Sequence, residues 1–256
     1  MNNTRQQMEI DPPRRRRYRL NVKKLGLTLV TIGCVAALVV LLVQYALTEE
    51  TQAQPENALA GPQGMDLSAN ALEGKCIVID AGHGGFDPGT MGATGVREDE
   101  LNLKVAQHLK NELEGLGAQI IMTRSDENAI AETKDEDMAE RRRIIEESGS
   151  DIVISIHMNS HTDPSTQGPL VLFMPGSTQG KELADEIMKS LNDTLGTDGN
   201  ARSDSLYILK SGNQPCVLVE CGYLSNATEE ASLMRDDYQS KLAAAICKGA
   251  AMFLAE

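Results

Sequence analysis

The alternation of short apolar runs with helical stretches constrains the fold of this chain more than any other feature. The apolar runs are four to six residues long, a length typical of buried strands. They lie at residues 76–80, 119–122, 151–156, 169–173, 206–209 and 216–220. Leucine and valine recur every four residues from Leu101 to Leu113, as on one face of a helix. Comparable helical patterns cover residues 135–147, 181–195 and 238–254. The sequence therefore predicts an α/β fold, a single domain with a mostly parallel six-stranded sheet flanked by helices.

A long apolar segment precedes this domain. Residues 25–47 carry no charge, and their 23 residues match the roughly 20 that a helix needs to cross a bilayer. Eight basic and two acidic residues come before them, so residues 1–24 carry +6 and the rest of the chain −19, out of −13 in total. No small-x-small cleavage site follows closely, because residues 44–46 read Gln-Tyr-Ala. We therefore predict a basic cytoplasmic segment at 1–24, an uncleaved transmembrane signal anchor at 25–47 and an extracytoplasmic remainder.

The stretch after the predicted anchor differs from the rest of the chain. Residues 48–73 are polar, contain Pro55 and Pro62, and show no sustained periodicity. They predict a flexible linker with a reach of about 30 Å, which would keep the globular part near the membrane. That globular part covers residues 74–256, enough for one domain with a sizeable core.

Charge and composition exclude several classes of function. The net charge of −13 disfavours nucleic acid as the main partner, because phosphate binding needs a basic face. Three Phe, five Tyr and no Trp argue against a lectin-like or single-strand-binding module, since both use aromatic stacking platforms. Five cysteines do not make a disulfide scaffold at this length. Those outside residues 25–47 lie in apolar patterns and are expected to be small buried side chains.

Four residues with metal-binding or acid–base chemistry are expected at one edge of the sheet. His83, His157 and Glu220 each lie at or just beyond the carboxyl end of a predicted strand. Ligands of open α/β sheets bind beyond these ends, so the three side chains are expected to share one site. Glu98 opens the helix after the first strand, where a carboxylate in the first turn can point into the same crevice.

The residue types at this edge favour zinc chemistry. Two imidazoles and one carboxylate form a frequent catalytic zinc set that leaves the fourth position open for water, which predicts Zn²⁺ at His83, Glu98 and His157. Zinc lowers the pKa of its water to about 7 and polarises an amide carbonyl. A second carboxylate must take the proton of the water and pass it to the departing amine. Glu220 is predicted to be this catalytic residue.

Other residues compete for these roles. Asp99 and Glu100 are the nearest rival carboxylates to the predicted ligand on the helix. His161 lies four residues after His157, the spacing at which two histidines on one helical face bind zinc. A strand precedes His157, however, and Met158 rather than Glu follows it, so the helical metalloprotease pattern is absent.

Four ordered blocks of the sequence resemble the zinc-dependent N-acetylmuramoyl-L-alanine amidases of bacterial wall hydrolases. The blocks are VIDAGHGGFDPGTMG at 78–92, GVREDELNL at 95–103, DIVISIHMNS at 151–160 and PCVLVECGYLSN at 215–226. The resemblance spans residues 75–254 and implies that His83, Glu98 and His157 hold zinc and that Glu220 is the catalytic glutamate. Arg141 also lies where this family carries an arginine. Its acidic surroundings predict a structural role in a solvated helix rich in ion pairs.

The resemblance implies hydrolysis of the amide between the lactyl group of N-acetylmuramic acid and the L-alanine of the peptidoglycan stem peptide. The anchored single-domain layout is most similar to the spore-cortex branch of the family, which implies cell-wall or cortex remodelling during sporulation. Peptidoglycan and, through the anchor, the membrane are the expected partners, nucleic acid is not, and a regulatory protein partner stays open. Two alternatives remain: a zinc peptidase that cuts within the stem peptide, since the same chemistry serves any amide, and a catalytically silent scaffold that binds wall fragments.

Overall fold

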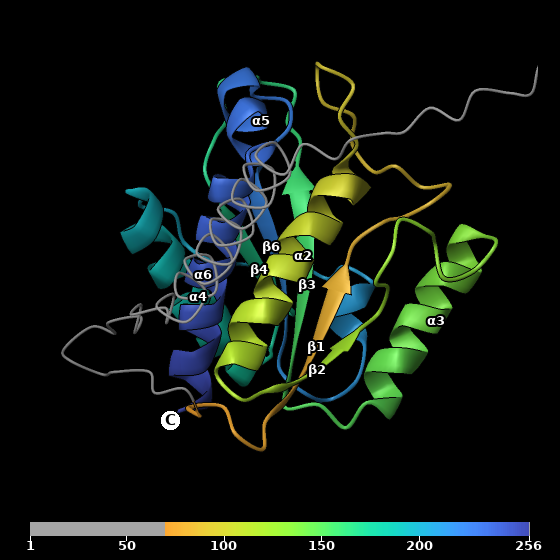
Figure 1. The fold of residues 1–256 in the computed structure, drawn as a ribbon, viewed down its shortest axis with the longest axis vertical. Helices are drawn as coiled ribbons and strands as arrows, with labels where there is room; N and C mark the ends of the chain where they lie inside the picture. The colour runs from red at the N-terminus through yellow and green to blue at the C-terminus, as the bar shows by residue number, and fades with distance from the viewer. Residues whose placement is uncertain (1–69, 256) are drawn as a thin grey trace, which may run out of the picture. The chain divides into compact units, whose positions relative to one another are not determined.

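Strands and helices alternate along the chain as the sequence predicts (Figure 1). The computed structural model describes residues 70–255. In chain order the elements are β1 (Cys76–Ala81), α2 (Glu98–Gly115), β2 (Gln119–Met122), α3 (Lys134–Glu147), β3 (Ile152–Asn159), β4 (Leu170–Phe173), α4 (Thr178–Leu195), β5 (Arg202–Ser203), the 3₁₀ helix η1 (Ile208–Lys210), β6 (Cys216–Tyr223), α5 (Ala227–Leu233) and α6 (Asp236–Leu254). The segments predicted at 1–24 and 25–47, and nearly all of the linker, lie outside the described residues. None of the described helices is long and apolar enough to cross a membrane.

The six strands form one sheet in the order β2-β1-β3-β6-β4-β5. Its pairs are parallel except β4 with β6, which is antiparallel. The sheet is therefore mixed, and the prediction of a mostly parallel sheet is corrected. The connection from β3 to β4, residues 160–169, contains no helix. A parallel crossover needs a dozen or more residues and usually a helix, so this short connection returns β4 in the opposite direction.

Helices cover both faces of the sheet. On one face α2, α4 and α6 pack over a large apolar cluster that includes Ile77, Ile79 and Ile154. On the other face α3 and η1 pack over a smaller cluster that includes Val78 and Val153. Neighbouring residues of a strand thus point to opposite faces, which explains why the central strands are mostly apolar instead of alternating apolar and polar residues. Figure 1 shows α3 on one side of the sheet and the three longer helices, α2, α4 and α6, on the other.

The prediction of a strand at residues 206–209 is wrong. Ile208 and Leu209 are buried in the smaller cluster, but they belong to η1 rather than to the sheet. A run of four apolar residues has too little length to distinguish a strand from a buried turn. The strand that completes the six-stranded sheet is instead β5, which pairs with β4 through Leu172 and Arg202. Both β5 residues are exposed, so no hydrophobic pattern marks this strand in the sequence.

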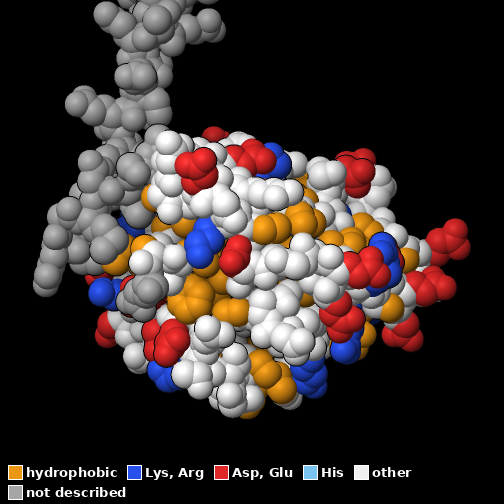
Figure 2. Space-filling view, turned by 90° about the horizontal axis from the view of Figure 1, so that it is seen from below, with side chains coloured by type: hydrophobic (Ala, Val, Ile, Leu, Met, Phe, Trp, Pro, Cys, Tyr) orange, Lys and Arg blue, Asp and Glu red, His pale blue; other side chains and the backbone are white. Residues whose placement is uncertain are grey.

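The two ends of the sheet differ in character. β1 and β3 point upward in Figure 1, so their carboxyl ends form the upper edge of the sheet. Figure 2 shows the molecule from below, where these strands begin, and acidic and basic side chains are interspersed with apolar ones there. A surface of mixed charge is typical of a solvated face. The predicted site residues belong to the other end of the strands.

Candidate active site

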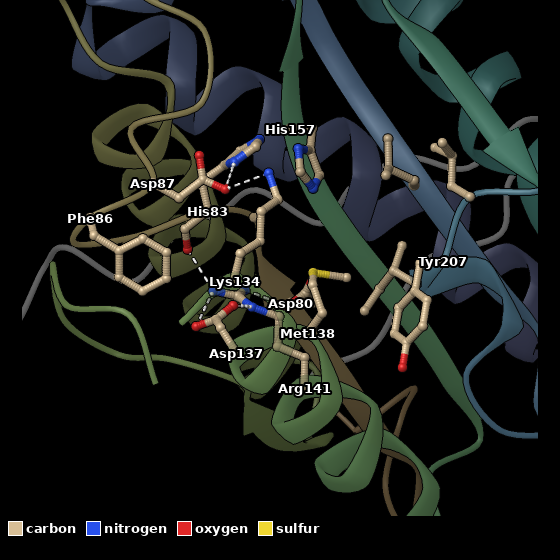
Figure 3. A pocket seen from close by; sticks show the side chains of 14 residues that line it. Asp80, His83, Phe86, Asp87, Lys134, Asp137, Met138, Arg141, His157 and Tyr207 are labelled. Atoms are coloured by element: carbon tan, nitrogen blue, oxygen red, sulfur yellow. Dashed lines mark hydrogen bonds and ion pairs between the residues drawn. The ribbon is translucent and has the colours of Figure 1, made fainter. Parts of the chain in front are cut away.

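Three of the four predicted site residues come together at the carboxyl edge of the sheet. His83 lies in the loop after β1, Glu98 is the first residue of α2, and His157 lies in β3. One ligand atom from each side chain can be chosen so that all three lie within 4.8 Å of one another. The rings of the two histidines meet edge to face, with centroids 4.9 Å apart, and both line the cavity shown in Figure 3.

Glu98 lies between the two histidines. Its Oε1 is 3.2 Å from His83 Nε2 and 3.0 Å from His157 Nδ1. Its Oε2 accepts a hydrogen bond of 2.8 Å from the backbone N–H of Thr90. Burial raises the pKa of Glu98, but hydrogen bonds and charges from the two histidines outweigh burial and hold the pKa far below its usual range. The carboxyl group is therefore ionised at neutral pH and suited to bind a cation.

His83 combines an uncommon backbone conformation with a fixed ring. It is the only non-glycine residue with positive φ (60°) in the described part of the chain. Its Nδ1 lies 3.0 Å from Asp87 Oδ2, and Lys134 Nζ lies 3.0 Å from the same oxygen. Burial lowers the pKa of His83, but the carboxylates of Glu98 and Asp87 raise it overall. A carboxylate on one ring nitrogen orients the ring and leaves the other nitrogen for a metal.

His157 and Glu220 lie inside strands rather than at their ends, which corrects the predicted positions. β3 continues to Asn159 and β6 to Tyr223, because the pairing of backbone groups does not require apolar side chains. The polar side chains end the apolar runs, but not the strands. His157 and Glu220 are direct partners across β3 and β6, and the register shifts just beyond them. A bulge of this kind is common next to active sites.

Glu220 has the properties of an acid–base group. Its Oε2 is buried and has no hydrogen-bond partner among the described residues. Burial raises the pKa of Glu220, and the nearby charge of His157 opposes this only in part. A carboxylate with a raised pKa beside a cluster of potential metal ligands is suited to accept and return a proton.

Arg141 is buried, which corrects the prediction that it belongs to a solvated helix face. Only 1% of its surface is exposed, and its guanidinium contacts Asp80 Oδ1 at 2.8 Å and Asp137 Oδ2 at 2.6 Å. The helical period accounts for this, since Asp137, Arg141 and Ile145 are four residues apart and form the buried face of α3. The next residue, Arg142, forms the exposed ion pair that the charge pattern predicts, with Glu146.

Two buried arginines bind the backbone of the loop that carries His83. Arg124 donates hydrogen bonds to the carbonyls of Ala81 at 2.8 Å and Gly82 at 2.9 Å. Arg141 donates to the carbonyls of Ala81 at 2.7 Å and His83 at 2.6 Å. Three consecutive carbonyls are thus satisfied by fixed guanidinium groups. These contacts hold the positive-φ conformation of His83 in place.

The rival residues lie outside the cluster. Asp99 is buried but turned toward Arg97, with Oδ1 2.8 Å from Arg97 Nε. Glu100 is largely exposed. His161 is exposed, and its Nδ1 accepts a hydrogen bond from the backbone N–H of Asp163. Among the described residues, the only group that could hold a metal is the one formed by His83, Glu98 and His157.

Comparison with known proteins agrees with this arrangement. A family model described as N-acetylmuramoyl-L-alanine amidase matches residues 77–251, well over half of the chain. The chain belongs to this family. It is therefore an amide hydrolase, as the sequence predicts.

Relatives of this amidase in Bacillus subtilis (strain 168) are similar over most of their length. The germination-specific N-acetylmuramoyl-L-alanine amidase is 31% identical over 197 residues, which cover 72% of this chain and 82% of that protein. The uncharacterized protein YqiI is 32% identical over 185 residues, which cover 71% of this chain and 86% of that protein.

Solved structures show the same fold. The CwlD amidase from Clostridioides difficile, in complex with the GerS lipoprotein, superposes with a TM-score of 0.68 at 31% identity and covers 70% of this amidase and 98% of that chain. The catalytic domain of the amidase CwlV from Bacillus(Paenibacillus) polymyxa var. colistinus gives a TM-score of 0.64 at 30% identity, with coverage of 70% and 98%.

Sequence reasoning missed several residues around the site of this amidase. Asp87 lies in the glycine-rich loop only four residues after His83, so the short spacing in the sequence could have indicated its contact with the imidazole ring. Lys134 comes from a segment with no recognisable motif, and nothing in the sequence indicates that Arg124 binds the loop of His83. Tyr207 lies in the run that was predicted as a strand, and only the tertiary structure places it at the cavity.

Proposed function

We propose that this amidase uses zinc to hydrolyse the amide between the lactyl group of N-acetylmuramic acid and the L-alanine of the peptidoglycan stem peptide. The observation that carries the proposal is the cluster of His83, Glu98 and His157 with Glu220 in register beside it. The matching family model supports the bond that is cleaved.

The donor set fits zinc. Two imidazoles and one ionised carboxylate are a frequent set of protein ligands for catalytic zinc, and their atoms lie close enough to share one ion. When bound, zinc would act as a Lewis acid that lowers the pKa of water and polarises an amide carbonyl. Asp87 fixes the ring of His83 from its far side, and the N–H of Thr90 fixes the carboxylate of Glu98.

Glu220 moves the proton in this scheme. Its carboxylate accepts a proton from the water that attacks the carbonyl carbon, and the new C–O bond forms. The same carboxyl group then donates that proton to the alanine nitrogen as the C–N bond breaks. The products are a free lactyl carboxylate and a peptide with a free amino group. The raised pKa makes the Glu220 carboxylate a better base, and it lies closer to neutral pH, so that the protonated group persists long enough to return the proton.

The cellular setting is a further part of the proposal. A role in the spore cortex is supported by the similarity to the germination-specific amidase of Bacillus subtilis. A regulatory lipoprotein partner is supported by the similarity to a CwlD structure that contains the GerS lipoprotein. Anchoring to the membrane is supported by the uncharged run at 25–47 and the basic residues before it. Cosedimentation of the full chain, but not of a chain that begins at residue 48, with lipid vesicles tests the anchor.

The activity is tested with purified peptidoglycan and the zinc-loaded protein. The expected product is a peptide with a new L-alanine amino terminus, and a chelator should abolish its formation until zinc is restored. Glu220→Gln should reduce turnover by about 10²- to 10⁴-fold with normal zinc content, whereas Glu98→Gln should lose zinc. Glu100→Gln is the matched control, because Glu100 is exposed on the same turn of α2, and it should behave as the wild type.

The products also separate the alternatives. New amino termini inside the stem peptide, found by mass analysis, would instead assign a peptidase. Zinc binding and wall binding without any product would assign a scaffold.

A further inference from the structure

A cavity of about 190 Å³ lies beside the two clustered histidines. Phe86 and Tyr207 stand on opposite sides of it, with Met138 between them (Figure 3). Five large hydrophobic side chains of the described residues are exposed, and three of them, Phe86, Leu206 and Tyr207, line this cavity. Exposed apolar side chains that gather at a concave site typically mark a ligand-binding surface.

Lys134 brings an available positive charge to this apolar cavity. The other cation in its lining, Arg141, is buried and already bound to two carboxylates and two carbonyls. The Lys134 side chain is 67% exposed, and the only salt-bridge partner of its ammonium among the described residues is Asp87. In Figure 3 this ammonium points toward the histidine end of the cavity. Because an ammonium group has three donors, Lys134 can bind a further anion.

The position of Lys134 in α3 also indicates a role beyond helix stability. Lys134 is the first residue of α3, where a cation opposes the helix dipole. The next three residues are acidic, as the dipole favours. Residues that break a local rule in an otherwise consistent element are expected at functional sites.

We propose that this cavity binds the peptide side of the cleaved amide and that Lys134 pairs with a carboxylate of that peptide. This inference rests on the proposed function and names how its site selects a substrate. The peptide side carries small aliphatic side chains and free carboxylates, whereas the sugar side carries neutral hydroxyl groups. Apolar walls with one available ammonium match the peptide, since an ammonium–carboxylate pair is a strong charge-assisted hydrogen bond. Lys134 is thus a residue that determines specificity.

The test compares two soluble peptidoglycan fragments that differ at the second peptide residue, which carries either a free carboxylate or a carboxamide. The wild type should have a KM about tenfold lower for the carboxylate fragment, the effect of one hydrogen bond to a charged group. Lys134→Ala should bring the ratio of the two KM values close to one. Lys134→Arg should retain the discrimination, and Lys134→Glu should reverse it. Lys181→Ala is the control, because Lys181 is also largely exposed and paired with a carboxylate, but lies on α4 across the sheet.

The zinc content of each variant separates substrate binding from support of the metal site. Normal zinc content of Lys134→Ala together with lost discrimination supports the proposal. Loss of zinc, or an equal rise in KM for both fragments, overturns it and assigns Lys134 to the support of Asp87. If the zinc-loaded wild type releases no peptide from either fragment or from whole peptidoglycan, the proposed function itself fails. Equal KM values for the two fragments in an active wild type overturn only the inference about the cavity.

Discussion

Gly82 and His157 are in close contact, and this contact sets the position of one candidate metal ligand. A Cβ atom on Gly82 would lie 2.2 Å from the imidazole ring of His157, which is shorter than any non-bonded contact. We expect Gly82→Ala to displace the ring and to weaken zinc binding about 10- to 100-fold, as loss of ligand orientation does in other metal sites. Competition with a zinc-binding dye measures this change.

The control for Gly82→Ala is Gly115→Ala. A Cβ atom on Gly115 would meet nothing within 4 Å, and alanine favours the helix that this residue ends. Zinc affinity should be unchanged in this variant. If Gly82→Ala, Gly115→Ala and the wild type bound zinc with equal affinity, the close contact between Gly82 and the ring of His157 would not determine the position of that ring.

Arg141 should contribute strongly to stability because it connects α3 to β1 and to the loop of His83. Replacing it leaves Asp80 and Asp137 buried without their cation. We expect Arg141→Met to lower the free energy of unfolding by about 3–5 kcal/mol, the usual cost of breaking a buried pair. Arg142→Met removes only an exposed pair and should cost less than about 1 kcal/mol. Urea denaturation of both variants measures the difference, and similar values would contradict the role of Arg141.

These residues show what the sequence alone can and cannot reveal about the site. His83 and His157 were predictable as neighbours because each follows an apolar strand run, and the carboxyl ends of these strands meet at one edge of the sheet. Glu98 was predictable beside them because it opens the helix after the first strand. The burial of Arg141 was not predictable from the sequence, since its charged neighbours on α3 suggest a solvated face. Lys134 reaches the cavity from the start of the same helix, and only the tertiary structure reveals such a contact.

The close packing of α4 against α6 depends on the glycine at position 249, which has no side chain. A Cβ atom on Gly249 would lie 2.4 Å from the Cα of Ile187, so the two helix backbones touch. Gly249→Ala should force the helices apart and lower the free energy of unfolding by about 1–3 kcal/mol, even though alanine is the better helix former. Gly115→Ala again serves as the control. Thermal unfolding measures both, and an unchanged or raised Tm for Gly249→Ala would contradict the close packing.

The elements differ in how well the sequence predicts them. The long helices follow from apolar residues at helical spacing, and the central strands follow from uninterrupted apolar runs. β5 has two exposed residues and α5 has seven residues in all, so neither is long enough to show a period. The direction of β4 follows from the length of its connection rather than from its own residues. An apolar run specifies burial, and its partners and direction come from the rest of the chain.

Asp80 connects several parts of the domain and makes its stability depend on pH. Its carboxylate contacts Arg141 of α3, Ser155 of β3 at 2.6 Å and Thr123 after β2 at 2.7 Å. Burial raises the pKa of Asp80, but the charge of Arg141 and the two hydroxyl hydrogen bonds outweigh burial and lower the pKa to about 2. The folded state therefore favours the ionised carboxyl more than the unfolded state does.

Because the pKa of Asp80 is lower in the folded state than in the unfolded state, the ionised carboxyl stabilises the fold at a pH above the unfolded-state pKa. This stabilisation is lost as the pH falls toward the folded-state pKa. We expect the free energy of unfolding to drop by about 2–3 kcal/mol on this account between about pH 5 and pH 2, as measured by urea denaturation. Ser155→Ala removes one hydrogen bond to Asp80, raises its pKa and should make the drop smaller. Ser190→Ala is the control, because Ser190 Oγ is buried with no partner among the described residues. If the free energy of unfolding fell equally with pH in the wild type, Ser155→Ala and Ser190→Ala, a carboxyl group other than Asp80 would be responsible for the pH dependence.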